Sequence, residues 1–450
     1  AGRLASPKGS HTATLLPDGR VLVVGGTDGV NTVDTTEVFD PSTGGWSVGT
    51  PLQFAREAHR ATALHDGRVL ITGGTGAGQP VNWTEIYDPE TAGWELGGRM
   101  ETARQGHAAT LLPDGRVLVT GGDFTKKSAE VFDPTNLSWK PAGNMEEARV
   151  DHSSTPLRDG RVLIAGGGDE STKFNTIEVY DPGAGRWVGE AFVGQWTLVG
   201  SLGQSRAEHS AMLLQDGRVL VAGGRTHVFE DLFSDAFATV FLDSAELYDP
   251  STRRWTTTGN MTVARGSPGA ILLEDGAVMV TGGRAIQHPR TEEERPRRVY
   301  LKSSEVYDPS TGRWLPGPGM NDARWNHTVT MLQDGRILAV GGEDDKGKLA
   351  SAETYDPATG KWTYTGSMEN PRAGHRAELL HDGRVVVAGG AENTAEFYDP
   401  EEGVWFRAGA LSQRVSRAGT ALLSDGKVIL IGGQGRQGPV HTVEFYEPGK

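Results

Sequence analysis

The sequence predicts an all-β chain built as a β-propeller of nine four-stranded antiparallel blades. One phrase, Asp-Gly followed by an apolar run and a glycine pair, recurs nine times along the 450 residues, first as DGRVLVVGG at 18–26. The glycine pairs end at positions 26, 74, 122, 167, 224, 283, 342, 390 and 433, so neighbouring pairs lie 43 to 59 residues apart. A repeat of this length indicates stacked units. Between the pairs, short strands alternate with turns and no helical period of useful length appears.

The first unit shows how four strands follow one another. HTATLL at 11–16 is the first strand, and the turn after it places Gly19 where a tight hairpin needs a positive φ. RVLVVGG is a continuous apolar run, which is the pattern of a strand covered on both faces. TEVFDP at 36–41 is the third strand, and Trp46 opens the fourth. Four antiparallel strands per unit, with the inner ones buried, form a propeller blade.

The ninth unit needs a strand from elsewhere, because it stops at FYEPGK before any Trp. We expect residues 1–5 to complete the blade begun by residues 417–448, which closes a ring and removes the open sheet edges. On this prediction residues 1–450 form a single propeller domain. The alternative is a ring of seven or eight blades plus an unclosed unit.

The recurring phrases Arg-x-x-His, Asp-Gly, Gly-Gly, Tyr-Asp-Pro and Trp resemble the kelch repeat over nearly the whole chain. The aromatic residue before Asp-Pro is Phe39, Tyr87, Phe132, Tyr180, Tyr248, Tyr307, Tyr355, Tyr398 and, before Glu-Pro, Tyr446. The Trp residues that follow are Trp46, Trp94, Trp139, Trp187, Trp255, Trp314, Trp362 and Trp405. The resemblance implies a binding platform for a protein, peptide or glycan as the commonest activity. It also includes copper-radical oxidases, whose site needs a Tyr cross-linked to a Cys.

Composition excludes several classes of function. The chain has no Cys, so it cannot form that Tyr-Cys cofactor, a disulfide or a thiolate metal site, and we expect no cofactor. The net charge of -14 and the lack of a long basic run argue against a nucleic-acid partner. No apolar stretch approaches the ~18 residues of a membrane span. Localisation stays open, with a secreted or bacterial cell-surface protein favoured over a cytoplasmic one, and we expect a monomer.

Charged residues that recur in every blade are expected to build the blade. A Glu stands two positions before each aromatic residue, as in Glu37 and Glu85, and is expected to accept hydrogen bonds from backbone or from a neighbouring Arg. A cation bound by a ring of these carboxylates is the alternative. Histidines three residues after an Arg or Lys, as in His59 and His107, occur one per blade and lie too far apart to share an ion, so no metal site is predicted.

The remaining residues are candidates for function. The loops between second and third strands should share one face with the blade-to-blade loops, and the insertions at 189–205, 225–244 and 284–303 should raise a wall over that face. The residues predicted to bind a ligand there are Arg225, His227, Arg284, Tyr300, Trp325 and Glu343. Three of them directly follow a glycine pair, which places them near the channel mouth. Arginines beside aromatic rings suit a carboxylate or a sugar-like ligand.

The function predicted from these residues is a non-enzymatic kelch propeller that binds a ligand or a protein through the insertion-bearing loops. No residue is assigned as catalytic. One alternative is a carbohydrate-active lyase, isomerase or hydrolase that uses the same loop residues at the channel mouth. The other is a structural module of a bacterial surface protein.

Overall fold

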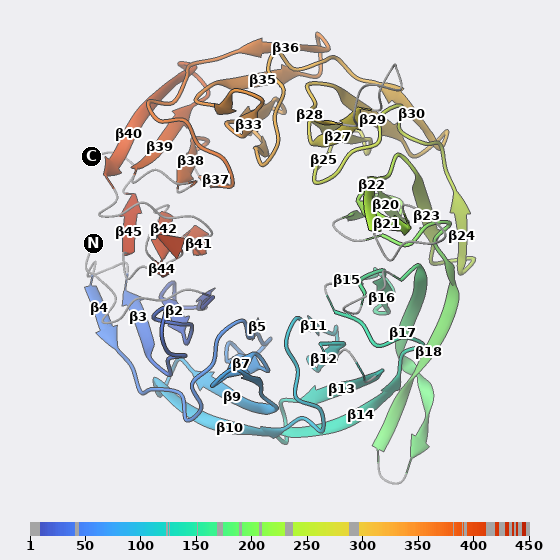
Figure 1. Cartoon of the computed structure of the whole chain (residues 1–450). Helices are drawn as coiled ribbons and strands as arrows, with labels where there is room; N and C mark the ends of the chain where they lie inside the picture. Colours follow the sequence, from blue (N-terminus) through green and yellow to red (C-terminus); the bar gives the residue numbers. More distant parts are fainter. Residues whose placement is uncertain are drawn as a thin grey trace. The chain divides into compact units, whose positions relative to one another are not determined.

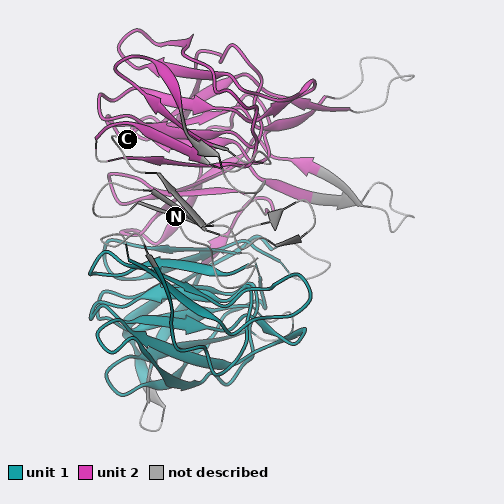
Figure 2. Cartoon of the chain, turned by 90° about the vertical axis from the view of Figure 1, so that its left-hand side faces the viewer, with its two compact units in different colours: residues 1–198, 411–450 teal, residues 199–410 magenta. Residues whose placement is uncertain are grey.

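A computed structural model describes most of the chain (Figure 1). The described residues are 10–40, 45–122, 125, 127–150, 152–168, 174–188, 191–206, 209–229, 237–287, 297–380, 382–388, 390, 394–410, 419–422, 428–431, 434–435, 438–439 and 443–446. The chain divides into two compact units, unit 1 with residues 1–198 and 411–450, and unit 2 with residues 199–410 (Figure 2). A single domain over 1–450 stays a prediction. Among the described residues, no helix is long and apolar enough to cross a membrane.

Unit 1 contains four four-stranded antiparallel sheets and one three-stranded sheet. The four-stranded sheets are β1 (Thr12–Leu15), β2 (Val21–Val24), β3 (Thr36–Asp40), β4 (Gly45–Val48); β5 (Arg60–Ala63), β6 (Val69–Thr72), β9 (Trp83–Asp88), β10 (Gly93–Arg99); β11 (Ala108–Leu111), β12 (Val117–Thr120), β13 (Ser128–Asp133), β14 (Ser138–Asn144); and β15 (Ser153–Pro156), β16 (Val162–Ala165), β17 (Thr176–Val188), β18 (Ala191–Ser201). The three-stranded sheet is β41 (Gly419–Leu422), β42 (Val428–Ile431), β45 (Val443–Tyr446). Short hairpins are β7 (Thr75–Gly76) with β8 (Gln79–Pro80) and β43 (Gln434–Gly435) with β44 (Gly438–Pro439).

Unit 2 contains four four-stranded sheets of the same topology. They are β19 (Ser210–Leu213), β20 (Val219–Ala222), β23 (Ala245–Asp249), β24 (Arg254–Thr257); β25 (Gly269–Leu272), β26 (Val278–Thr281), β29 (Ser304–Asp308), β30 (Arg313–Pro316); β31 (Thr328–Met331), β32 (Ile337–Val340), β35 (Ala352–Asp356), β36 (Lys361–Tyr364); and β37 (Arg376–Leu379), β38 (Val385–Ala388), β39 (Thr394–Asp399), β40 (Val404–Ala410). Its hairpins are β21 (Arg225–Phe229) with β22 (Phe237–Phe241), β27 (Arg284–Gln287) with β28 (Arg297–Tyr300), and β33 (Glu343–Asp344) with β34 (Gly347–Lys348).

The all-β kelch-type fold is confirmed, but the prediction of nine four-stranded blades is wrong. The described chain forms eight four-stranded blades, and the ninth set of motifs forms the sheet β41-β42-β45 with three strands. The prediction counted Asp-Gly turns and glycine pairs, which mark only the inner strands of a unit. A full blade also needs the outer strand that opens with Trp, and the ninth unit has none. Residues 1–5, which were expected to supply it, lie outside the described residues.

The insertion at 189–205 also differs from expectation. It does not add to the predicted loop face; instead β17 and β18 run on as a long hairpin at the outer edge of the fourth blade (Figure 1). The ring of Trp196 packs on Tyr180, with centroids 5.2 Å apart, and the side chain of Trp187 lies outside the described part of the chain. The insertion therefore lies between the third and fourth strands. The sequence pattern selects Trp187, because the Trp follows the aromatic residue by seven positions in the other units, and only the folded chain shows Trp196 beside Tyr180.

The hydrophobic core lies between consecutive blades. All four residues of β2 are buried, as the continuous apolar run predicts. Leu22 and Val24 of β2 belong to the same cluster as Val69 and Ile71 of β6 in the next blade. Each sheet therefore removes its apolar surface from water only by packing against its neighbour, which is why the unit is repeated.

One arginine before the first strand holds the blade together in seven of the eight four-stranded blades, from the second to the eighth. The Arg104 side chain is fully buried and its Nη2 donates to Glu130 Oε1 at 2.9 Å, while its Nη1 donates to the carbonyl of Gly121 at 2.6 Å. The same carboxylate accepts from the backbone N–H of Glu101 at 2.6 Å. The equivalent ion pairs are Arg56–Glu85, Arg149–Glu178, Arg206–Glu246, Arg265–Glu305, Arg324–Glu353 and Arg372–Glu396. The expectation that the repeated Glu is structural is confirmed for these blades.

The carbonyl of the same arginine explains the glycine pair. Gly74 donates its N–H to Arg104 O at 2.8 Å, which joins one blade to the next. Gly73 has φ +54, and a Cβ there would lie 2.5 Å from Arg104 O and 2.6 Å from Cε1 of His107. No L side chain tolerates both the backbone conformation and the close approach, so glycine is required.

Removal of the buried ion pair should cost much more than removal of a surface pair. In Arg104→Met, Glu130 keeps a buried negative charge without its cation, and we expect the free energy of unfolding to fall by about 3–5 kcal/mol. The matched control is Arg116→Met, which breaks the exposed turn pair with Asp114 and should cost about 1 kcal/mol or less. Urea titration of both variants measures the difference. Equal losses would contradict the structural role of Arg104.

A second pair of variants separates close approach from backbone strain. A Cβ at Gly341 (φ +55) would lie 2.5 Å from Arg372 O, which is a clash. A Cβ at Gly360 (φ +66) would meet no atom within 4 Å. We expect Gly360→Ala to cost about 1 kcal/mol for the positive φ. Gly341→Ala should cost at least about 2 kcal/mol more, because a neighbouring blade must also move. Thermal unfolding of the two variants, converted to free energy, tests this order.

Candidate functional site

The repeated histidines connect blades and do not form a metal centre. His59 Nε2 lies 2.8 Å from Oγ1 of Thr12 in the preceding blade, and His107 Nε2 lies 2.9 Å from Oγ1 of Thr72. Each ring therefore sits between two neighbouring sheets. Among the described residues, no group of three His, Asp or Glu side chains is placed to hold a metal ion.

Burial dominates the protonation of these histidines. The pKa of His107 is lowered to about 3 by burial first, and then by the positive charges of Arg60 and Arg104. Burial and Arg324 likewise lower the pKa of His327 to about 3. Both rings are neutral at physiological pH, so they act as hydrogen-bond partners and not as acids or bases in a reaction.

The predicted site residues lie on three hairpins of unit 2 and on the strand connection beside them. Arg225 and His227 are on β21, where they pair with Phe241 and Thr239 of β22, and the side chain of His227 lies outside the described part of the chain. Arg284 opens β27 directly opposite Tyr300 of β28. The two long hairpins of unit 2 extend from the same side of that unit (Figure 2).

The structure brings three of the predicted residues into direct contact. The guanidinium carbon of Arg284 lies 4.1 Å from the ring centroid of Trp325, which is within cation–π range. The ring of Tyr300 lies 6.3 Å from that of Trp325, centroid to centroid, at 39°. Glu343 joins them through the backbone: its N–H donates to Trp325 O at 2.8 Å and its carbonyl accepts from Trp325 N–H at 3.0 Å.

Two residues that the sequence analysis left out of the site support this cluster. Phe241, at the end of β22, is 7% exposed, and the centroid of its ring lies 5.7 Å from the guanidinium carbon of Arg284. Gly266 bridges to Arg284, and a Cβ there would collide with the Phe241 ring. One signal was available: Gly266 and Trp325 both directly follow the repeated arginine, at a position where other blades carry Glu57 or Gln105.

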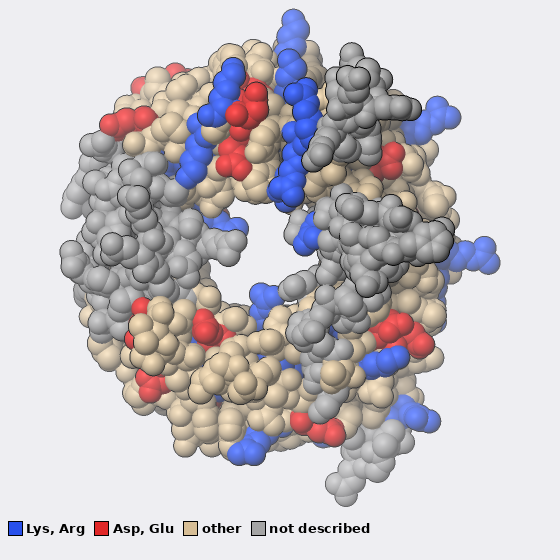
Figure 3. All heavy atoms as spheres, viewed as in Figure 1, with Lys and Arg blue, Asp and Glu red and all other residues tan. Residues whose placement is uncertain are grey.

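Charges of both signs surround the cluster. Where Figure 1 places β28 and β33, basic side chains flank acidic ones on the face shown in Figure 3. Arg297 is exposed on β28 and donates through Nε to Gln287 at 2.9 Å. Arg284 has no hydrogen bond or ion pair from its guanidinium to any described residue, and its buried Nε has no partner there. The cluster thus presents a stacked cation beside aromatic rings.

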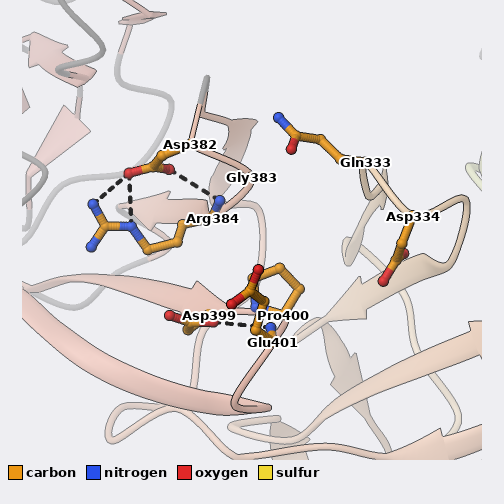
Figure 4. A pocket seen from close by; sticks show the side chains of 8 residues that line it. All are labelled: Gln333, Asp334, Asp382, Gly383, Arg384, Asp399, Pro400 and Glu401. Atoms are coloured by element: carbon orange, nitrogen blue, oxygen red, sulfur yellow. Dashed lines mark hydrogen bonds and ion pairs between the residues drawn. The ribbon is translucent and has the colours of Figure 1, made fainter.

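A cavity of about 470 Å³ lies among the tight turns of the seventh and eighth blades, not among the hairpins (Figure 4). Its acidic residues mostly serve their own turns. Asp382 accepts from Nε of Arg384 at 2.9 Å, and Asp399 accepts from the backbone N–H of Glu401 at 2.9 Å. Burial raises the pKa of Asp382, but the hydrogen bonds and charge of Arg384 outweigh it and lower the pKa overall. These residues recur in other blades, which indicates turn structure rather than a ligand site.

The fold and its repeated contacts define a protein of the kelch-propeller class. The sequence profile described as the kelch motif matches residues 9–53, 58–101, 152–190, 208–262 and 326–369, which together make up just over half of the chain. The chain therefore belongs to the kelch-repeat family, as its motifs predict.

Two curated relatives resemble short parts of the chain. A stretch of 103 residues, 23% of the chain, is 34% identical to beta-scruin of Limulus polyphemus and covers 11% of that protein. A stretch of 75 residues, 17% of the chain, is 31% identical to a galactose oxidase of Gibberella zeae and covers 9% of it. The match thus spans about a tenth of the length of each relative.

Two solved structures have a backbone fold similar to that of this chain. A copper complex of a novel fungal alcohol oxidase of the AA5 family has a TM-score of 0.47 and 16% identity, covering 99% of this chain and 98% of that one. The structure of YjhT has a TM-score of 0.40 and 15% identity, covering 66% of this chain and 98% of that one. Both TM-scores are below 0.5, so no argument rests on them.

The neutral histidines predict a loss of stability in mild acid. A histidine in the unfolded chain binds a proton near pH 6.5, whereas His107 in the folded chain does so only near pH 3. The contribution of the neutral His107 ring to the free energy of unfolding is present above about pH 6.5 and is lost as the pH falls. At pH 5 the loss is about 2 kcal/mol. The free energy of unfolding in urea should therefore drop between pH 7.5 and pH 5, and His107→Gln should reduce the drop by that amount. The control His65→Gln, at an exposed turn, should leave it unchanged.

Proposed function

We propose that this chain is a binding module without chemistry of its own, which holds a ligand on the hairpins of unit 2. The observation that carries the proposal is the contact of Arg284, Trp325 and Tyr300. These residues come from two consecutive blades and belong to no repeated set. The repeated arginines described above, such as Arg265 and Arg324, form ion pairs inside their blades, so a stacked Arg outside these pairs is the feature to explain by binding.

The arrangement of the site supports binding over catalysis. Arg284 lies against two aromatic rings, which fixes its position and leaves the edge of the guanidinium for a ligand. The histidines that are buried, such as His327 and His375, are committed to hydroxyl groups of neighbouring strands. A general acid or base must instead reach the reacting group of a bound substrate.

The similarity to a galactose oxidase does not extend to a copper-radical site. The family of copper-radical oxidases needs a Tyr cross-linked to a Cys, and this chain has no Cys. Within the described residues, no cluster of potential ligands is placed for a metal ion either. The side chains present therefore do not fit that group, and no step through it is derived.

A carbohydrate-active enzyme is the second candidate function. The observation in its favour is that Glu343 pairs directly with Trp325 through the backbone, and that the ring of Trp325 lies against the cation of Arg284. A carboxylate and a guanidinium at one site could act on a sugar. Recovery of the ligand after binding decides between the two functions, because a binding module returns the ligand unchanged.

The proposal is tested by exchange of a hairpin that the structure shows to be equivalent. Leu301 and Val81 both donate their N–H to the second glycine of the preceding pair, so residues 284–300 occupy the place of residues 75–80. A variant in which TGAGQP replaces residues 284–300 keeps the blade and removes Arg284 and Tyr300. We expect it to lose the ligand that the wild-type chain binds on an array of glycans and peptides.

The matched control carries the same TGAGQP in place of residues 27–32, an equivalent loop of the same length in unit 1. It should bind as the wild type does, and circular dichroism should show that both variants are folded. Mass spectrometry of the eluted ligand should show an unchanged mass. Retained binding by the 284–300 variant would contradict the proposal, and a changed mass would favour the enzyme.

A further inference from the structure

We infer that the ligand of the Arg284 site is an acidic sugar, a uronate whose carboxylate is held by Arg284. The inference rests on the proposed function and names the ligand class for the same site. It follows from three features of the described residues: the charge balance of Arg284, the occupied aromatic faces, and the carboxylate of Glu343.

Arg284 differs in its charge balance from the arginines of unit 2 that recur from blade to blade. The fully buried Arg265 and Arg324 each have a Glu within 3 Å, and the turn arginines Arg218 and Arg336 each have an Asp in the same turn. Arg284 is half-buried and has no carboxylate within ion-pair distance among the described residues. A partly buried cation that no described carboxylate balances favours an anionic ligand.

The geometry of the stack selects which atoms of Arg284 meet that ligand. Trp325 at 4.1 Å and Phe241 at 5.7 Å lie against the guanidinium as cation–π partners. Stacking uses the flat faces of a guanidinium and leaves its N–H edges, which match the two oxygens of a carboxylate. The backbone bridge between Gly266 and Arg284 fixes the backbone of Arg284, and the two rings fix its guanidinium. The guanidinium is therefore oriented before the ligand binds.

The same stack argues against a neutral sugar that binds by ring stacking alone. One side of Trp325 already contacts Arg284, and Tyr300 stands tilted at 39° beside it. A neutral sugar would bring no charge to Arg284, which no described carboxylate balances. A uronate brings a negative charge, and its C–H face can pack on Tyr300.

Glu343 gives the site an acceptor for hydroxyl groups. It is half-buried, its backbone is tied to Trp325 at 2.8 and 3.0 Å, and no ion pair joins its carboxylate to a described residue. A carboxylate accepts hydrogen bonds only, so it suits the hydroxyls of a sugar ring. A donor for the carboxylate and an acceptor for the hydroxyls thus adjoin the same Trp.

The experiment is a saturation-transfer NMR titration of the whole chain with D-glucuronate and with D-glucose, which differ in the carboxylate. We expect glucuronate to bind at least about tenfold more tightly than glucose, and Arg284→Gln to weaken glucuronate binding by about tenfold or more. The control is Arg297→Gln, which removes the same charge from an exposed position on the same hairpin and should leave the affinity unchanged.

Three results would overturn the inference. The first is equal binding of glucuronate and glucose, or no binding of either. The second is an equal effect of Arg284→Gln and Arg297→Gln, which would reduce the role of Arg284 to net charge. The third is binding of N-acetylglycine as tight as that of glucuronate, since that would show a general carboxylate site with no selection for the sugar. If glucuronate fails while the 284–300 exchange still abolishes capture of another ligand, the proposed function stands and only the uronate is wrong.

Discussion

The structure depends on one arginine that belongs to two blades at once. The Arg104 side chain is buried against Glu130 in its own blade, while its backbone carbonyl accepts the N–H of Gly74 from the blade before. A buried charge needs both a counter-ion and further hydrogen bonds, so the arginine occurs with the glutamate, and the glycine pair allows the close approach to the carbonyl of that arginine. Their joint repetition along the chain is the result of this single contact.

This contact also decides which parts of a blade are free to vary. The loop after the glycine pair returns to that pair and to the arginine of the next blade: Leu301 donates its N–H to Gly283 O, and its carbonyl accepts from the N–H of Arg324. Anything between those two points leaves the ion pair intact. Residues 75–80 and residues 284–300 can therefore occupy the same place, and a hairpin that carries Arg284 and Tyr300 costs the blade nothing in its own contacts.

Sequence pattern was sufficient for the parts that repeat and insufficient for the parts that do not. The turn at Asp18–Gly19, the buried strand β2 and the structural role of Glu130 follow from periodicity and local chemistry. The number of four-stranded blades does not, because motifs mark inner strands and an outer strand is defined by its partner. The contact of Trp196 with Tyr180 was not predicted for the same reason, since strand register is a property of the pair.

For the candidate site, the sequence by itself determined the residues: Arg284, Tyr300, Trp325 and Glu343 stand out because they break the repeat. The tertiary structure decided how they meet, with the guanidinium stacked on Trp325 and supported by Phe241, a residue that pattern alone did not select. The physical reason is that repetition reports what every blade needs within itself and from its neighbour. A contact made once, between particular side chains of two hairpins, leaves no period in the sequence.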